Sequence, residues 1–398
     1  MPPSLTTDHR QLANLKSEIL NLKSVPGGKL GNMLHGCATP AGTARYRERF
    51  TDSAPHHFRN RQSLIISSLG IGTYLGNADQ ATDKNYADSV IRSIQRGSNV
   101  IDTAANYRFQ RSERSIGQAL AMLTTERGFD RSELLICTKG GYLPFDATQP
   151  RDVRDYIETT FVQTGVASWE DFVGGVHCMT PAYLQNQLEQ SLLNMGIDCV
   201  DVYYIHNPES QLGYISEAEF YHRLRLAFDR LEENRANGKL QWYGLATWNG
   251  FRVPAQSREY HSLSRIAETA QQAGGESHGF RFVQLPFNLA MPEALTLMNQ
   301  RIKDEDLTML EAAAQLGVTV IASASMLQGR VARGLPETVR KPLGSLATDA
   351  QTAVQFVRST PGITTALIGM SRVEHVEENL KLVNVEPVGA DNFAQLFS

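Results

Sequence analysis

The chain has 398 residues, a formal charge of −4, 41% apolar residues and four cysteines. This apolar fraction is typical of a globular core and excludes a largely disordered chain. No apolar stretch approaches the roughly 20 residues of a membrane span, and the weak net charge does not favour a nucleic-acid surface. The first residues lack the apolar core of a signal peptide. We therefore expect a cytoplasmic protein, a monomer or weak homo-oligomer, that acts on a small molecule.

The cysteines are too sparse for a disulfide scaffold, and none forms a CxxC pair. Cys137 and Cys199 alternate within apolar runs and are expected to be small core residues. His177 and Cys178 are neighbours, but no second pair with ligand spacing accompanies them. We therefore expect no metal site.

Short apolar or β-branched runs recur along the chain, with helical patterns between them. Predicted strands begin near Leu64, Asn99, Glu133, Cys199, Leu240, Phe280, Val318 and Thr364. These runs recur roughly every 40 residues, which is the length of a strand–loop–helix–loop unit. One interval is longer by about thirty residues, and residues 140–180 within it are rich in Pro and Gly. We expect an irregular excursion there.

Helix start and stop signals support these units. Thr180 and Pro181 precede an apolar helical face that ends at Gly196, and Ser216 opens a second helix. Ser371 begins the pattern Ser-Arg-Val-Glu, which predicts a capping box at the last helix.

Eight strands that are each followed by a helix are the order of a (β/α)8 TIM barrel, whereas a doubly wound open sheet is the alternative. We expect the barrel within residues 61–398, with the excursion at 140–180. Residues 1–60 then form an N-terminal extension to which no fold is assigned.

Four titratable residues follow adjacent predicted strands at one rim of such a barrel, where catalytic groups lie. Asp102 ends the second strand and Tyr107 follows it, whereas Lys139 and His206 end the third and fourth strands. Each residue alone has an ordinary structural explanation, such as a cap, a solvated lysine or a packed tyrosine. Their matched positions together favour a catalytic site.

Around these residues the sequence resembles the aldo-keto reductase superfamily. The matching segments are LGIGTYLG (69–76), IDTAANYRFQRSERSIGQAL (101–120), LLICTKGG (134–141), DCVDVYYIHNPE (198–209), GKLQWYGLATWN (238–249), VQLPFN (283–288), VIASASMLQGRV (320–331) and ALIGMSRVEHVEENL (366–380). They occur in the family's order across all eight units. The extension and residues 140–180 lie outside the resemblance.

The resemblance implies that Asp102, Tyr107, Lys139 and His206 form a catalytic tetrad for NADP-dependent interconversion of carbonyls and alcohols. Tyr107 would supply the proton, and a cationic Lys139 would lower the pKa of its phenol. Asp102 would keep Lys139 charged and oriented. His206 would polarise the carbonyl oxygen. The hydride would come from a nicotinamide cofactor, which is NADPH or, alternatively, NADH.

The resemblance also implies a set of cofactor-binding residues. They are Gly72, Thr73, Tyr74, Asp102, Thr247, Gln284, Ser323, Gln328, Gly329, Ser371, Arg372, His375, Glu378 and Asn379. Three positions depart from the family pattern. The family's Ser-Asn reads Ala246-Thr247, its stacking aromatic is Ser323, and a lysine of some members aligns near Gly369. A preference for NADPH therefore rests on Ser371 and Arg372 at a helix N-terminus, and it is expected to be moderate.

Two other functions remain open at this point. One is a nucleotide-binding regulatory or scaffold subunit of the same fold with little turnover. The other is an open-sheet Rossmann dehydrogenase that uses the glycines at 70–76. We expect the loops at 140–180 and 207–216 and the C-terminal tail to choose the substrate, with Phe161, Trp169 and Phe172 forming an apolar wall over the rim.

Overall fold

A computed structural model of the chain describes residues 33–397. Eight parallel strands close a barrel in the order β11-β12-β3-β4-β5-β6-β7-β8. They are β3 (Leu69–Gly72), β4 (Val100–Asp102), β5 (Leu135–Gly140), β6 (Val200–His206), β7 (Leu240–Ala246), β8 (Phe280–Pro286), β11 (Thr319–Ser323) and β12 (Ile363–Gly369). The predicted (β/α)8 barrel is confirmed, and the open doubly wound sheet is wrong.

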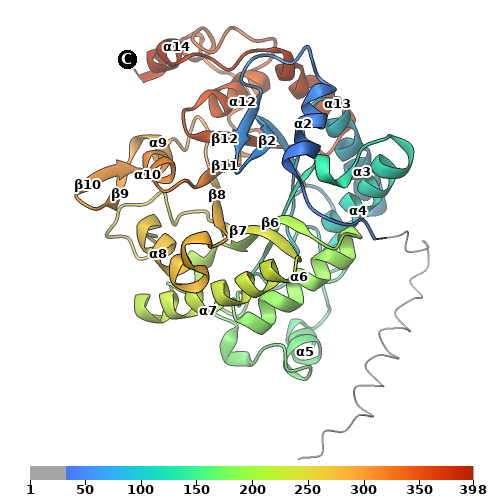
Figure 1. The fold of residues 1–398 in the computed structure, drawn as a ribbon, viewed down its shortest axis with the longest axis vertical. Helices are drawn as coiled ribbons and strands as arrows, with labels where there is room; N and C mark the ends of the chain where they lie inside the picture. Colours follow the sequence, from blue (N-terminus) through green and yellow to red (C-terminus); the bar gives the residue numbers. More distant parts are fainter. Residues whose placement is uncertain (1–32, 398) are drawn as a thin grey trace, which may run out of the picture. The chain divides into compact units, whose positions relative to one another are not determined.

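A helix follows each barrel strand and covers the outside of the barrel (Figure 1). These helices are α3 (Gln80–Gln95), α4 (Arg111–Glu126), α6 (Pro181–Met195), α7 (Glu217–Ala236), α8 (Leu263–Gly274), α10 (Met309–Gln315), α12 (Asp349–Ser359) and α13 (Val373–Asn379). Shorter elements interrupt the connections: α5 (Val153–Ile157), α9 (Glu293–Thr296), the hairpin β9 (Met298–Ile302) and β10 (Glu305–Thr308), α11 (Glu337–Arg340) and the terminal α14 (Ala390–Ala394). Within residues 33–397 no helix is long and apolar enough to cross a membrane.

Most of the predicted helix start and stop residues are confirmed. Pro181 is the first residue of α6, Gly196 ends it in a left-handed conformation, and the Ser216 side chain accepts from the Glu219 N–H at the start of α7. The capping box at Ser371 is wrong. The N-cap of α13 is Arg372, whose side chain makes no capping hydrogen bond.

The first predicted strand is two strands. β1 (Phe58–Arg61) and β2 (Leu64–Ser67) form an antiparallel hairpin, and the barrel strand β3 begins only at Leu69. The chain turns at Ser68, whose N–H donates to the carbonyl of His57. Leu64 and Ile66 of the hairpin pack with inward-facing barrel residues such as Val100, at the amino end of the strands. The hairpin therefore covers the barrel floor.

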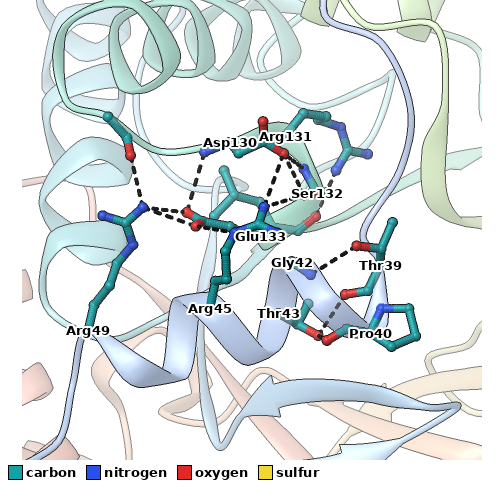
Figure 2. Close-up of polar contacts among 12 residues, drawn as sticks. Thr39, Pro40, Gly42, Thr43, Arg45, Arg49, Asp130, Arg131, Ser132 and Glu133 are labelled. Carbon is teal, nitrogen blue, oxygen red and sulfur yellow. Dashed lines mark hydrogen bonds and ion pairs between the residues drawn. The ribbon is translucent and has the colours of Figure 1, made fainter.

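The segment before this hairpin also belongs to the barrel. The compact unit begins at Leu34, not at the boundary near residue 60 that the sequence suggested, and residues 1–32 lie outside the described chain. Helix α2 (Pro40–Glu48) lies against the turn at 130–133, as Figure 2 shows. A Cβ on Gly42 would lie 2.2 Å from the Ser132 carbonyl oxygen, so only glycine permits this approach.

Polar contacts fix α2 at this position. The Thr39 N–H donates to the Ser132 carbonyl at 3.0 Å, and Arg49 just after α2 pairs with the buried Glu133 at 3.0 Å (Figure 2). Cys37 and Cys199 form a disulfide. The expectation that Cys199 is a free core residue is therefore wrong, because the sequence does not show that residue 37 lies beside the start of β6.

Candidate active site

A cavity of about 820 Å³ opens at the carboxyl ends of the barrel strands. Strand register brings these ends together: Gly72 pairs with Asp102, and His206 pairs with Ala246. The cavity is lined by these predicted residues: Gly72, Thr73, Tyr74, Asp102, Tyr107, His206, Thr247, Gln284, Ser323, Gln328, Gly329, Ser371, His375, Glu378 and Asn379. Lys139 and Arg372 are not part of the lining.

Lys139 lies beneath the cavity surface, only 1% exposed, and forms an ion pair with Asp102. Its Nζ donates to Asp102 Oδ2 and to the Thr103 carbonyl, both at 2.7 Å. Gln284 Nε2 donates to the other oxygen, Asp102 Oδ1, at 2.7 Å. Burial lowers the pKa of Lys139, but the neighbouring Asp102 and Tyr107 outweigh it and raise that pKa. Lys139 is therefore a cation at neutral pH.

Tyr107 lies above this ion pair. Lys139 Nζ is 4.9 Å from the centroid of its ring, and the His206 ring meets it edge-on with centroids 5.9 Å apart. Burial raises the pKa of the Tyr107 phenol, and Lys139 opposes this without reversing it. The net direction differs from the sequence-based expectation, which considered the lysine but not the loss of solvent around the ring.

His206 is neutral. Burial, and then the Lys139 charge, lower its pKa well below the usual value. Its buried Nδ1 has no hydrogen-bond partner among the described residues. The fully buried His177 contacts the backbone here, since its Nε2–H donates to the His206 carbonyl at 2.8 Å. Tyr142 packs edge-on against both histidines, with ring centroids 5.2 Å apart in each pair.

The motif that follows Tyr107 supports its loop. Ser112 Oγ donates to the Thr73 carbonyl at 2.7 Å, and Glu113 accepts from Thr138 Oγ1 at 2.6 Å beside Lys139. A Cβ on Gly117 would lie 2.7 Å from the Asn194 carbonyl oxygen, so glycine lets α4 approach α6 closely. The residues of the pattern SE..IG thus connect α4 to the loop after β3, to β5 and to α6.

Part of the cavity wall depends on a buried carboxylate. Glu209 Oε1 accepts from the N–H groups of Trp248 and Asn249, at 2.6 and 2.9 Å, just after Thr247. Burial raises the pKa of Glu209, and these backbone donors oppose the increase. Thr247 Oγ1 is buried and has no partner in the described chain. This hydroxyl can therefore form a hydrogen bond with a bound molecule, which is consistent with a cofactor in the cavity.

The loop after β12 and the helix α13 that follows it provide the polar side chains expected at the adenosine end of a cofactor. Ser371, His375 and Asn379 line the cavity, and Asn379 Oδ1 is buried with no partner in the part of the chain that the structure describes. Arg372 is exposed instead, and its Nη2 lies 2.7 Å from His375 Nε2. Arg372 therefore contacts a residue of the cavity lining without lining the cavity itself.

Sequence reasoning missed several lining residues, including Asn106, Tyr142, Asn207, Trp248 and Arg333. Tyr142 could have been found, because it is the aromatic residue three positions after Lys139 on the same rim. Trp248 and Asn207 directly follow predicted site residues. Within residues 33–397 no cluster of three or more His, Cys, Asp or Glu residues could hold a metal ion.

The predicted apolar wall is wrong. Phe161 and Phe172 pack on Tyr183 of α6 in a separate cluster, and Trp169 lies partly buried against it. None of these aromatic residues lines the cavity. The tail does not reach the cavity either, since Phe393 of α14 stacks on Phe356 of α12 with centroids 5.5 Å apart.

Comparison with known proteins assigns the chain to a family and identifies relatives. The family model described as "Aldo/keto reductase family" matches residues 68–398. A Schizosaccharomyces pombe protein named as a putative voltage-gated potassium channel subunit beta is 23% identical over 346 residues, which cover 83% of this chain and 88% of that protein. The uncharacterized oxidoreductase YqkF of Bacillus subtilis is 22% identical over 355 residues, with coverages of 84% and 93%.

Solved structures agree. An aldo/keto reductase from Klebsiella pneumoniae in complex with NADP and acetate has a TM-score of 0.58 and 18% identity, over 86% of this chain and 94% of that one. The aldo-keto reductase AKR11C1 from Bacillus halodurans, in its holo form, has a TM-score of 0.57 and 18% identity, over 85% and 95%. At this identity the likeness shows a common fold.

Proposed function

Because the chain is a member of the aldo/keto reductase family, we propose that it is an NADP-dependent oxidoreductase that interconverts an aldehyde or ketone and an alcohol. The observation that supports this most strongly is the convergence of four groups on one cavity. Tyr107 and His206 lie edge-on against each other at the cavity surface, and the ion pair of Lys139 with Asp102 lies beneath. A proton donor, a polarising group and a fixed cation are what carbonyl reduction requires of a protein.

Each group has a distinct role in this proposal. Tyr107 donates its phenolic proton to the carbonyl oxygen. Lys139 stabilises the tyrosinate that remains, and Asp102 keeps the Lys139 ammonium at a fixed place. His206, which is neutral, has one N–H that can donate to the same oxygen. When bound, a nicotinamide cofactor supplies the hydride.

The cavity residues provide donors and acceptors along the length of such a cofactor. Gln284, Ser323 and the partnerless Thr247 Oγ1 would hold the nicotinamide end. Gln328 and Gly329 would lie at the pyrophosphate. The adenosine end would be contacted by Ser371, Arg372, His375, Glu378 and Asn379. The nicotinamide ribose would be contacted by Gly72, Thr73 and Tyr74. The Klebsiella neighbour contains NADP, which favours this cofactor, and NAD stays possible.

The proposal is tested by consumption of NADPH, followed by its absorbance, against a panel of aldehydes, ketones, quinones and sugars. Tyr107→Phe removes the proton donor but keeps the ring, so we expect more than a tenfold loss of kcat, since general acid catalysis contributes about 10²–10⁴-fold. The Kd for NADPH should hardly change. A variant that retains more than a tenth of the wild-type kcat would contradict the role of Tyr107.

A second function shares the cavity. The Schizosaccharomyces pombe relative is named as a putative channel subunit, so a nucleotide-binding regulatory or scaffold subunit with little turnover is the alternative. The same experiment separates the two. Tight cofactor binding with no turnover of any panel member, in either direction, would favour the regulatory subunit.

A further inference from the structure

Three consecutive residues directly after Tyr107 have left-handed backbones. The φ angles of Arg108, Phe109 and Gln110 are 48°, 58° and 67°. This region is unfavourable for residues with a Cβ, which normally enter it singly. A run of three such residues beside the candidate proton donor therefore needs contacts that hold it in place.

Arg108 makes the strongest of these contacts on one side of the loop. Its side chain is only 2% exposed and forms an ion pair with Asp83 at the start of α3. Nε donates to the Asn77 carbonyl at 2.9 Å, and Nη2 donates to the Asp79 carbonyl at 3.4 Å. The guanidinium also lies 5.2 Å from the centre of the Tyr86 ring. Arg108 thus joins the Tyr107 loop to the loop after β3.

Weaker contacts hold the other side. The Phe109 carbonyl accepts from the Ala147 N–H at 2.9 Å, and Gln110 Nε2 donates to the Phe145 carbonyl at 3.1 Å. Asn194 of α6 donates to Gln110 Oε1 at 3.0 Å. The run is therefore held between two segments of the rim, and only Arg108 contributes a buried charge to it.

We propose that Arg108 is a positioning residue that keeps the Tyr107 hydroxyl over Lys139 by stabilising the left-handed backbone behind it. This inference rests on the proposed function. Arg108 does not line the cavity, so it acts through the backbone of its neighbour and not on a substrate. Its loss should change kcat and leave KM and cofactor affinity nearly unchanged.

The test compares three variants. Arg108→Ala removes the guanidinium and keeps a Cβ, so kcat should fall by about 10²-fold, the order expected when a catalytic group is misplaced. Arg108→Gly also removes the guanidinium, but glycine adopts φ near 48° readily, so most of the activity should return. Arg301→Ala, which removes an exposed ion pair with Asp306 on the β9–β10 hairpin, is the matched control and should behave as wild type.

Two results would overturn the inference. Wild-type kcat in Arg108→Ala would show that the guanidinium does not position Tyr107. An equal loss in the Ala and Gly variants would show that the left-handed backbone is not what Arg108 stabilises. If the Ala variant does not fold, Asp83→Asn weakens the same contact, and a kcat equal to that of the wild type would overturn the inference in the same way.

Hydrogen exchange provides a readout that needs no turnover. Exchange of the peptide covering residues 104–114 should accelerate in Arg108→Ala and stay close to wild type in Arg301→Ala. A wild-type enzyme that turns over no carbonyl, combined with faster exchange in the Ala variant, would refute the proposed function alone. Unchanged exchange would refute the role of Arg108.

Discussion

Replacing Lys139 by Met removes the one cation beneath Tyr107 while nearly preserving side-chain volume. The Nζ lies 4.9 Å from the Tyr107 ring centre. Two unit charges at that distance interact by about 3 kcal/mol at an effective dielectric constant of 20. Lys139 favours the tyrosinate, so its loss raises the pKa of Tyr107 further. The tyrosinate available at a fixed pH then falls by on the order of a hundredfold.

Alcohol oxidation is the sensitive assay, because Tyr107 must then accept a proton and the rate rises with pH through its pKa. In Lys139→Met this rise should move to higher pH, and the rate at pH 8 should fall by about a hundredfold. Asp102 keeps the hydrogen bond from Gln284 and can take up a proton, so the protein should still fold. An unchanged pH profile with reduced kcat would refute the electrostatic coupling of Lys139 to Tyr107.

Three further outcomes are expected. Arg372→Ala should raise the Kd of NADPH about tenfold to a hundredfold and leave that of NADH unchanged, and equal losses would show that it does not read the 2′-phosphate. Buried His57, His177 and His261 have pKa values lowered by desolvation to about 3, 4 and 4, so stability is retained above pH 6.5 and lost as the pH falls toward 4. Each histidine should contribute up to about 1.4 kcal/mol per pH unit, and equal urea midpoints at pH 7 and 5 would contradict this. The disulfide of Cys37 closes a loop of 162 residues, so reductant should lower the melting temperature of the wild type but not of Cys37→Ser, corresponding to roughly 4–5 kcal/mol.

The barrel could be predicted because its strands are short apolar runs that recur between helical patterns. The candidate tetrad could be predicted because each member ends a strand or follows one closely, and strand ends share a rim. The division of the first run into β2 and β3 could not, since LIISSLG has no Gly, Pro or charged residue before its last position and its turn at Ser68 depends on the carbonyl of His57, just before β1. Periodicity does not report such a contact.

Contacts between segments that lie far apart in the sequence could not be predicted either. Cys37 meets Cys199 only because Leu34 pairs with Ile197 just before β6, and Phe161 meets Tyr183 only because the excursion folds back on α6. The raised pKa of Tyr107 depends on how much solvent the folded rim excludes. The sequence indicates which charged residues lie near the Tyr107 phenol, but it does not show how much solvent surrounds that phenol.

The hairpin that covers the amino end of the barrel also limits how molecules reach the cavity. Within the described residues, Ala38, Leu64 and Ile66 pack with the inward-facing strand residues in one apolar cluster that closes the amino end of the barrel. Everything that enters the cavity must leave by the same rim. Asp102 and Gln284 lie deep, at 4% exposure, whereas Tyr74 and Trp248 are 58% and 43% exposed. A molecule that reaches Asp102 and Gln284 from the rim therefore passes the exposed rings of Tyr74 and Trp248, which line the same cavity.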